Sequence, residues 1–212
     1  MTPDTGAFEA AAAILAEGVT DHAFPAACAE VGGREGALWR QAFGARTYDP
    51  YDHAIQDDTI FDLASLTKVI STTTLAMRAI DDGVLRLDEP VRGRLRDWRG
   101  ADREQVTVRD LLAHASGLPA YLPFFRDHTG RAEFDAAICR TPLEYPPGTR
   151  SLYSDLGFIL LGFILEDVRR SSPAPGRFEP AAALAAQLQA VASSLTTEPL
   201  LFNPPRALRG RI

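Results

Sequence analysis

The sequence of 212 residues predicts an α+β fold, with two strands near the N-terminus followed by a mainly helical region. Two observations support this prediction. The apolar segments "FPAACAEVGG" and "GALWRQAFGART" flank a Gly-Gly-Arg-Glu-Gly turn, a pattern typical of a β-hairpin. After residue 60, apolar residues recur instead at helical spacing. We therefore expect a single domain in three parts: an N-terminal helix and hairpin (1–60), a helical region (61–170), and a linker, helix and irregular end (171–212).

Two of the expected helices lie in the first 80 residues. An Ala-rich segment predicts a helix over 7–17, before the hairpin. A second helix is expected over 66–80, where an apolar face ends at an Asp-Asp-Gly sequence. We expect the apolar residues of this second helix to be buried; they are Val69, Ile70, Leu75, Ala76, Met77 and Ile80.

The second half of the chain predicts three further helices. Thr107 and Asp110 form a capping-box pattern, which predicts a helix over 108–115 that Gly117 ends. In "EYPPGTRSLYSDLGFILLGFILEDV", a Pro-Gly loop becomes an apolar helix that Ser154 or Asp155 is placed to cap. After the Ser/Pro-rich segment "RRSSPAPGRFEP", an Ala-rich helix is expected to run to about residue 193.

Composition excludes several classes of function. A formal net charge of -6 and a pI near 5.2 argue against a nucleic-acid partner, because phosphate binding needs clustered Lys and Arg. No apolar run approaches the ~20 residues of a membrane span, and no signal peptide is recognisable, so a soluble cytoplasmic protein is expected. Cys28 and Cys139 are expected to be buried free thiols. No metal-ligand spacing is present, and no cofactor is implied.

A serine and a lysine three residues apart, Ser65 and Lys68, stand at the start of the predicted helix 66–80. Residues at this spacing share a helix face, so the Lys68 amine can lie beside the Ser65 hydroxyl. A neutral amine can take the proton of a serine nucleophile, and burial together with the helix dipole is expected to favour the neutral amine. Taken alone, the pair is also compatible with an ordinary helix start in which Ser65 is the N-cap.

Further groups extend this chemistry. Tyr153 is expected in the loop that precedes an apolar helix, where its hydroxyl can serve as a second proton carrier. Backbone N–H groups at the start of the Lys68 helix are suitable partners for an oxyanion.

Four segments in register carry a resemblance to a known family: "FDLASLTKVI", "LDEPV", "VTVRDLLAHASGLP" and "PPGTRSLYSDLGFILLG". Together they resemble the serine β-lactamase-related family, which includes class C β-lactamases, penicillin-binding DD-peptidases and related esterases. The resemblance implies a β-lactamase/transpeptidase-like fold. It also implies that Ser65 is acylated, and that Lys68 and Tyr153 transfer protons.

Asp155 and His114 can be compared with the corresponding positions of the family. Asp155 stands where the class C pattern has Asn, and a carboxylate cannot donate a hydrogen bond to a substrate carbonyl. This difference favours an ester over a β-lactam, and leaves Asp155 as either a substrate-binding residue or a helix cap. His114 in "HASG" is expected to have a structural role, as in the similar stretch of the family.

The family's third motif, a Lys or His followed by Thr or Ser and Gly on a strand, has no match after Tyr153. "HTG" at 128–130 precedes Tyr153 and lacks a strand pattern, so we interpret it as a chance match. The sequence thus resembles a truncated family member in which the C-terminal strands of the antiparallel sheet are missing. An incomplete sheet would expose an unpaired edge, so aggregation or self-association is expected.

Two functions of different class follow. The first is a serine hydrolase that forms an acyl-enzyme on Ser65 and acts on a small ester or amide, with β-lactams included. The second is a non-catalytic or weakly active binding module that keeps the helical half of the fold. The intact Ser65, Lys68 and Tyr153 favour the first, and the absent third motif favours the second. The sequence does not distinguish ester, β-lactam and peptide substrates.

Overall fold

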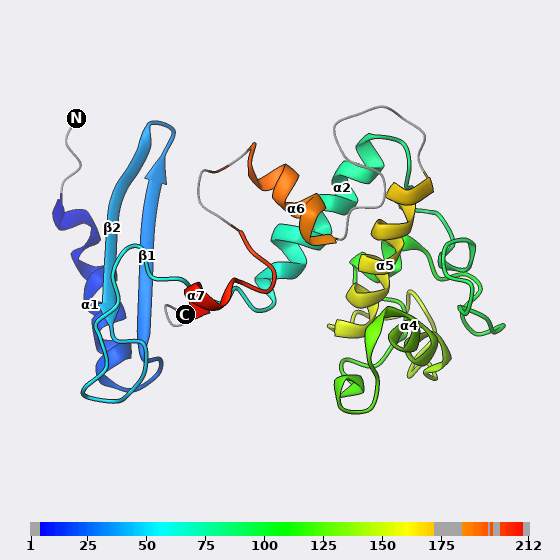
Figure 1. The fold of residues 1–212 in the computed structure, drawn as a ribbon, viewed down its shortest axis with the longest axis horizontal. Coiled ribbons are helices and arrows are strands. Elements are labelled where there is room, and N and C mark those ends of the chain that lie inside the picture. Colours follow the sequence, from blue (N-terminus) through cyan, green and yellow to red (C-terminus); the bar gives the residue numbers. More distant parts are fainter. Residues whose placement is uncertain (1–4, 172–183, 195, 197–199, 210–212) are drawn as a thin grey trace. The chain divides into compact units, whose positions relative to one another are not determined.

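The computed structural model describes residues 5–171, 184–194, 196 and 200–209. The chain divides into two compact units, Met1–Asp62 with Pro204–Ile212, and Leu63–Asn203. Each unit is described on its own below (Figure 1).

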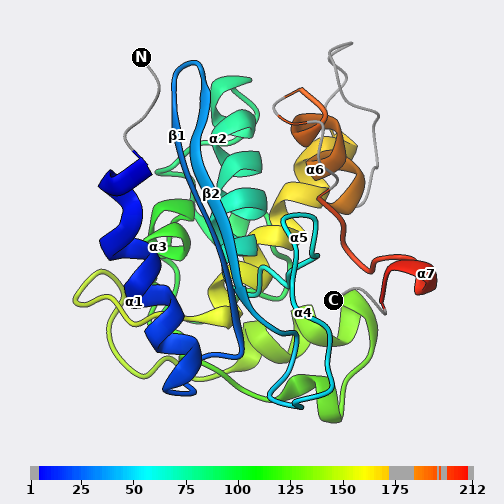
Figure 2. The ribbon, with the colours of Figure 1, turned by 90° about the vertical axis from the view of Figure 1, so that its left-hand side faces the viewer.

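The first unit is a helix packed on a hairpin, as the sequence predicts. A short 3-10 helix, η1 (Thr5–Phe8), leads into α1 (Glu9–Thr20), and strands β1 (Ala26–Gly33) and β2 (Gly36–Gly44) pair antiparallel. α1 lies along the hairpin, where the Phe8 ring stacks on the Trp39 ring of β2 at a centroid distance of 5.5 Å. Figure 2 shows α1 beside the two strands. The short helix α7 (Arg206–Arg209) belongs to the same unit.

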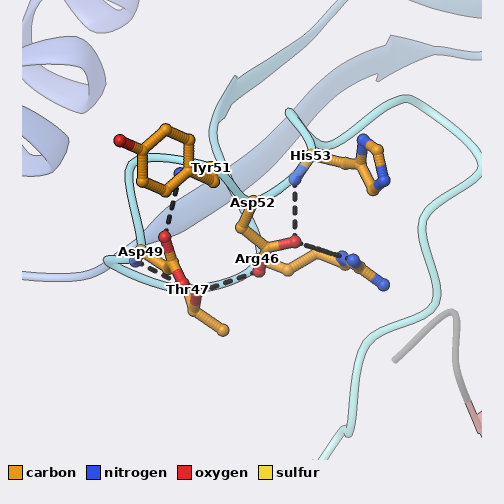
Figure 3. A network of polar contacts seen from close by, with 6 residues as sticks. All are labelled: Arg46, Thr47, Asp49, Tyr51, Asp52 and His53. Atoms are coloured by element: carbon orange, nitrogen blue, oxygen red, sulfur yellow. Dashed lines mark hydrogen bonds and ion pairs between the residues drawn. The ribbon is translucent and has the colours of Figure 1, made fainter.

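The hairpin ends at a position that only glycine can occupy. Gly44 has φ +79°, and a Cβ atom there would lie 2.2 Å from the carbonyl oxygen of Pro25. The following loop is held by polar contacts around Asp52 (Figure 3). The Asp52 carboxylate accepts hydrogen bonds from the Arg46 guanidinium at 2.7 Å, the Thr47 hydroxyl at 2.9 Å and the His53 N–H at 2.7 Å.

The second unit is mainly helical, and α5 (Asp155–Ser171) is its central helix. η2 (Lys68–Thr73, a π-helical segment) continues into α2 (Thr74–Asp81). The short helices η3 (Val91–Gly93), α3 (Val108–Leu112) and η4 (Phe124–Arg126) follow. The other helices of the described residues are α4 (Gly130–Arg140) and α6 (Leu184–Ala192). α5 packs against α2, α3, α4 and α6 (Figures 1 and 2).

The core of this unit surrounds α5. The side chains of Leu160, Leu161 and Ile164 are fully buried, and the apolar run "LGFILLGFIL" therefore forms a core helix. Trp98 is also buried, and its indole N–H donates to the carbonyl oxygen of Arg103 at 3.1 Å. Every helix in the described part of the chain is too short or too polar to span a membrane.

The predicted buried face of residues 66–80 is correct only in part. Leu75 and Ala76 are buried, but Val69 and Met77 are exposed, with 62% and 65% of their surface accessible. The buried face continues instead through the hydroxyl residues Ser71 and Thr72 of η2, the segment that contacts α5. Because these two side chains are polar, a pattern of apolar residues alone does not reveal this face.

The cysteine prediction is also correct only in part. Both thiols are free, and Cys139 is buried in α4, where its Sγ donates to the Asp135 carboxylate at 3.1 Å. Cys28 is exposed, because it lies in β1 of a two-stranded hairpin that offers little cover. The "HTG" segment at 128–130 leads into α4 and forms no strand, as expected.

Candidate active site

Ser65 lies in the turn that leads into η2, and Lys68 is the first residue of η2. The Lys68 ammonium donates a hydrogen bond to the Ser65 hydroxyl oxygen, with Nζ and Oγ 3.2 Å apart. Ala64, immediately before the serine, has φ +44°, a strained left-handed backbone for a residue with a Cβ. The predicted pair is therefore formed, and the turn that carries the serine is strained.

Tyr153 joins this pair from the loop before α5. The Lys68 Nζ atom lies 4.7 Å from the centroid of the Tyr153 ring. Hydrogen bonding to Lys68 and then to Ser65 lowers the pKa of the Tyr153 phenol below its ordinary value. About half of the Tyr153 side chain remains accessible, so a ligand can reach it.

His114 holds the Tyr153 loop in place. Its Nδ1 accepts a hydrogen bond from the Ser154 N–H at 2.9 Å, and its carbonyl oxygen accepts one from the Leu152 N–H at 2.8 Å. Its ring packs on the Tyr153 ring at a centroid distance of 4.6 Å. Burial and the nearby Lys68 charge lower the pKa of His114, so the imidazole is neutral at pH 7 and supports the loop.

The position of His114 follows from the way α3 ends. The capping box of Thr107 and Asp110 is formed as predicted, but α3 ends at Leu112, before the predicted residue 115. His114 has φ +56° and takes the left-handed position after the helix that glycine usually occupies. The Ala115 N–H then bonds the Asp110 carbonyl at 2.7 Å, which closes the C-terminus and explains why Gly117 is not the terminator.

Asp155 is the first residue of α5 and forms an ion pair with Lys68, with Oδ1 and Nζ 2.6 Å apart. Ser154, the residue before it, caps the helix, because its Oγ accepts a hydrogen bond from the Gly157 N–H at 3.3 Å. Asp155 therefore does not cap α5 and instead contacts the lysine.

The expectation that Lys68 is neutral is wrong. Burial favours the neutral amine, but hydrogen bonds from the ammonium to Asp155 and Tyr153 and the charge of Asp155 outweigh it, and the pKa of Lys68 is raised. Burial and the helix dipole both favour a neutral amine, but the Asp155 carboxylate, which is distant in the sequence, lies at contact distance from Lys68. Lys68 is thus an ammonium group at neutral pH.

A further signal in the sequence, which the sequence analysis did not use, supports the assignment of Lys68 to this site. Lys68 is the single lysine of the chain, and the other 21 basic residues are arginines. An arginine cannot act as a neutral or proton-exchanging amine, whereas a lysine can. Among the described residues, no group of three or more His, Cys, Asp or Glu side chains is arranged to hold a metal ion.

Comparison with known proteins gives one family. The family model described as "Beta-lactamase" matches residues 11–175. The chain is 29% identical over 152 residues to a proposed D-alanyl-D-alanine carboxypeptidase of Escherichia coli (strain K12), covering 62% of this chain and 35% of that protein. It is 35% identical over 121 residues to an N-acetylmuramyl-L-alanine amidase of Bacillus subtilis (strain 168), covering 51% of this chain and 27% of that protein.

Solved structures agree with the sequence matches. The fold resembles a class C beta lactamase from Rhodobacter sphaeroides with a TM-score of 0.74 and 27% identity, over 95% of this chain and 53% of that structure. It also resembles SurE with a TM-score of 0.60 and 32% identity, over 77% of this chain and 35% of that structure. The chain therefore spans about a quarter to a half of the length of these relatives. The matches confirm the predicted β-lactamase/transpeptidase-like fold, of which the described residues contain two strands.

Proposed function

Because the chain belongs to the beta-lactamase family, whose members are serine hydrolases, we propose that it hydrolyses a small ester or amide through an acyl-enzyme on Ser65. One observation carries this proposal. The Ser65 hydroxyl is 3.2 Å from the Lys68 ammonium, which also lies over the Tyr153 ring. A serine beside two proton-exchanging groups is the arrangement that an activated nucleophile requires.

In this proposal Tyr153 takes the proton of Ser65. Lys68 is held as an ammonium by Asp155, so at neutral pH it has no lone pair with which to accept a proton. The same ammonium stabilises a Tyr153 phenolate, whose pKa is lowered. Ser65 Oγ attacks the acyl carbon, Tyr153 receives the hydroxyl proton, and Tyr153 then passes this proton to the leaving oxygen or nitrogen.

The backbone beside Ser65 supplies one group for the developing oxyanion. Within the described part of the chain, the Ser65 N–H donates to no protein acceptor, whereas the next three N–H groups bond to the carbonyl oxygens of residues 63, 64 and 65. A substrate carbonyl at Ser65 can therefore accept a hydrogen bond from this N–H. This N–H follows Ala64, whose φ of +44° is strained for a residue with a Cβ.

The names of the relatives support amides among the proposed substrates. A carboxypeptidase and an N-acetylmuramyl-L-alanine amidase both cleave amide bonds, whereas a carboxylate at position 155 in place of an amide favours an ester. We therefore propose that activated esters react first, and that amides and β-lactams are slower substrates.

One observation favours a second candidate, a binding module with little or no turnover. Residues 63–203, as far as they are described, contain no strand, so no strand of this unit lines the site. A ligand held by the helical unit alone would bind less tightly and in a less defined orientation.

A fluorophosphonate probe tests the first candidate directly, because it phosphonylates activated serines. We expect one adduct on the intact protein by mass spectrometry, and peptide mapping should place it on Ser65. Ser71, Ser116 and Ser154 are each at most 1% exposed and should remain unmodified.

Ser65→Ala should abolish the adduct, and Ser194→Ala, which removes an exposed hydroxyl on another part of the unit, should leave it intact. Undiminished labelling of the Ser65→Ala variant would assign the reactive group to another residue. A wild-type protein that folds but never labels would favour the binding module.

A further inference from the structure

The ion pair between Lys68 and Asp155 sets the charge of the site around Ser65. The Lys68 side chain is 15% exposed and the Asp155 side chain 40% exposed, so the pair lies at the edge where a substrate would enter. The ammonium contacts three groups of the same site: the Asp155 carboxylate at 2.6 Å, the Ser65 hydroxyl at 3.2 Å and the Tyr153 ring at 4.7 Å. Asp155 is thus in direct contact with the group that also contacts the nucleophile.

The cluster formed by Ser65, Lys68, Tyr153 and Asp155 carries no net charge. Lys68 contributes one positive charge and Asp155 one negative charge, while Tyr153 is neutral when protonated. His114, the other titratable group that faces Lys68, is neutral because burial and the Lys68 charge lower its pKa. With Tyr153 protonated, an asparagine at position 155 would leave the positive charge of Lys68 without a counterion.

The binding of a substrate that carries a carboxylate would depend on this difference in the charge of the site. A unit charge a few ångströms away changes binding of an anion by roughly tenfold at the dielectric of a partly exposed site, and salt weakens the effect. With Asp155 in place, the attraction by Lys68 and the repulsion by Asp155 largely cancel for such a substrate.

We propose that Asp155 is a specificity-determining residue that neutralises Lys68 and adapts the site to uncharged acyl substrates, in preference to acyl groups that carry a carboxylate. This inference rests on the proposed function, because it assumes that Ser65 is acylated. It assigns Asp155 a role through Lys68, in addition to any contact with the substrate.

Two esters that differ only in charge test the inference. The mono-4-nitrophenyl ester of adipic acid carries a carboxylate, and its methyl ester is neutral with the same leaving group. We expect Asp155→Asn to raise the ratio of kcat/KM for the anionic ester to kcat/KM for the neutral ester by about tenfold, and added salt to reduce this gain.

Asp88→Asn is the matched control. Asp88 is an exposed partner of Arg86, and its replacement removes the same charge from the protein away from the site. This variant should keep the wild-type ratio. Asp155→Ser provides a second neutral variant, with the same expectation as Asp155→Asn, if the asparagine variant folds poorly.

A second readout does not depend on turnover. Because Lys68 is the single lysine, ¹⁵N-lysine labelling gives one side-chain ammonium signal, and its titration reports the pKa of Lys68 alone. This pKa should fall in Asp155→Asn. An unchanged ester ratio would overturn the specificity role even with Ser65 labelling intact. An unchanged Lys68 titration would overturn the ion pair. A wild-type protein with no more esterase activity than Ser65→Ala would instead overturn the proposed function, and the substrate preference with it.

Discussion

The two compact units are stabilised in different ways. In the described residues 5–62, Phe43 and Ile55 are the buried apolar side chains, whereas residues 63–203 bury a continuous core around α5. The hairpin unit depends more on turns and polar contacts, such as those of Asp52 (Figure 3). The residues of the candidate site all lie in the helical unit, so the better-packed unit holds the geometry of Ser65, Lys68 and Tyr153.

The sharpest test of this contrast removes volume from each unit. Leu161 is completely buried in α5, and Leu161→Ala should lower the free energy of unfolding by about 2–5 kcal/mol through lost contacts and a cavity. Val31 in β1 is 38% exposed, and Val31→Ala should cost less than about 1 kcal/mol. Urea denaturation measures both.

Each unit carries one tryptophan, so the fluorescence of each tryptophan reports the unfolding of one unit. Trp98 is buried in the helical unit, and Trp39 lies on β2 of the hairpin unit. Trp39→Phe leaves Trp98 as the single reporter, and Trp98→Phe leaves Trp39. Equal costs of Leu161→Ala and Val31→Ala would show that the two units do not differ in packing.

The next largest effects concern catalysis. Tyr153→Phe should lower the rate of Ser65 acylation by a factor on the order of 10², the usual effect of losing a proton-transfer group. Lys68→Ala should lower this rate by a similar factor, because it removes the ammonium that lowers the pKa of Tyr153. Stopped-flow measurement of 4-nitrophenol release gives this rate. Tyr51→Phe, on a 93% exposed tyrosine of the hairpin unit, is the matched control and should acylate at the wild-type rate.

Circular dichroism should remain unchanged in these variants, because Tyr153 is half exposed and Lys68 lies at the start of a helix. Full activity of both variants would place the proton carriers elsewhere in the chain.

A smaller effect is expected at the capping box of α3. The Thr107 hydroxyl accepts a hydrogen bond from the Asp110 N–H at 3.3 Å, and the Asp110 carboxylate accepts one from the Thr107 N–H at 2.9 Å. Thr107→Ala should lower the free energy of unfolding by about 1 kcal/mol. Thr107→Ser keeps the hydroxyl and should restore most of the loss. Equal free energies of unfolding for the alanine and serine variants would show that the Thr107 cap does not contribute to stability.

Local signals predicted much of this structure. The hairpin, the capping box of α3 and the start of α5 depend on turn and cap residues within a few positions of one another, so the sequence alone indicates them. The pairing of Ser65 with Lys68 was predictable for the same reason, since residues three apart share a helix face.

Contacts between distant segments were not predictable in this way. The ion pair of Lys68 with Asp155 joins residues far apart in the chain, and it reverses the expected direction of the Lys68 pKa. The His114 bond to the Ser154 N–H is of the same kind. The burial of the Ser71 and Thr72 hydroxyls depends on how η2 packs on α5, and no local sequence pattern indicates that packing.

The smallest expected effect is an acid transition confined to the hairpin unit. Hydrogen bonds from Arg46 and Thr47 lower the pKa of the Asp52 carboxyl from 3.8 to about 2. A carboxyl with a lowered pKa stabilises the fold above its unfolded pKa, so the contribution of Asp52 is complete above about pH 4 and is lost as the pH falls through about 2. Trp39 fluorescence in the Trp98→Phe background should report this step between pH 5 and 1.5. Asp52→Asn should remove the step, because its amide does not titrate. If Trp39 and Trp98 change together over this range, acid unfolds both units as one, and the contrast in stability between them is wrong.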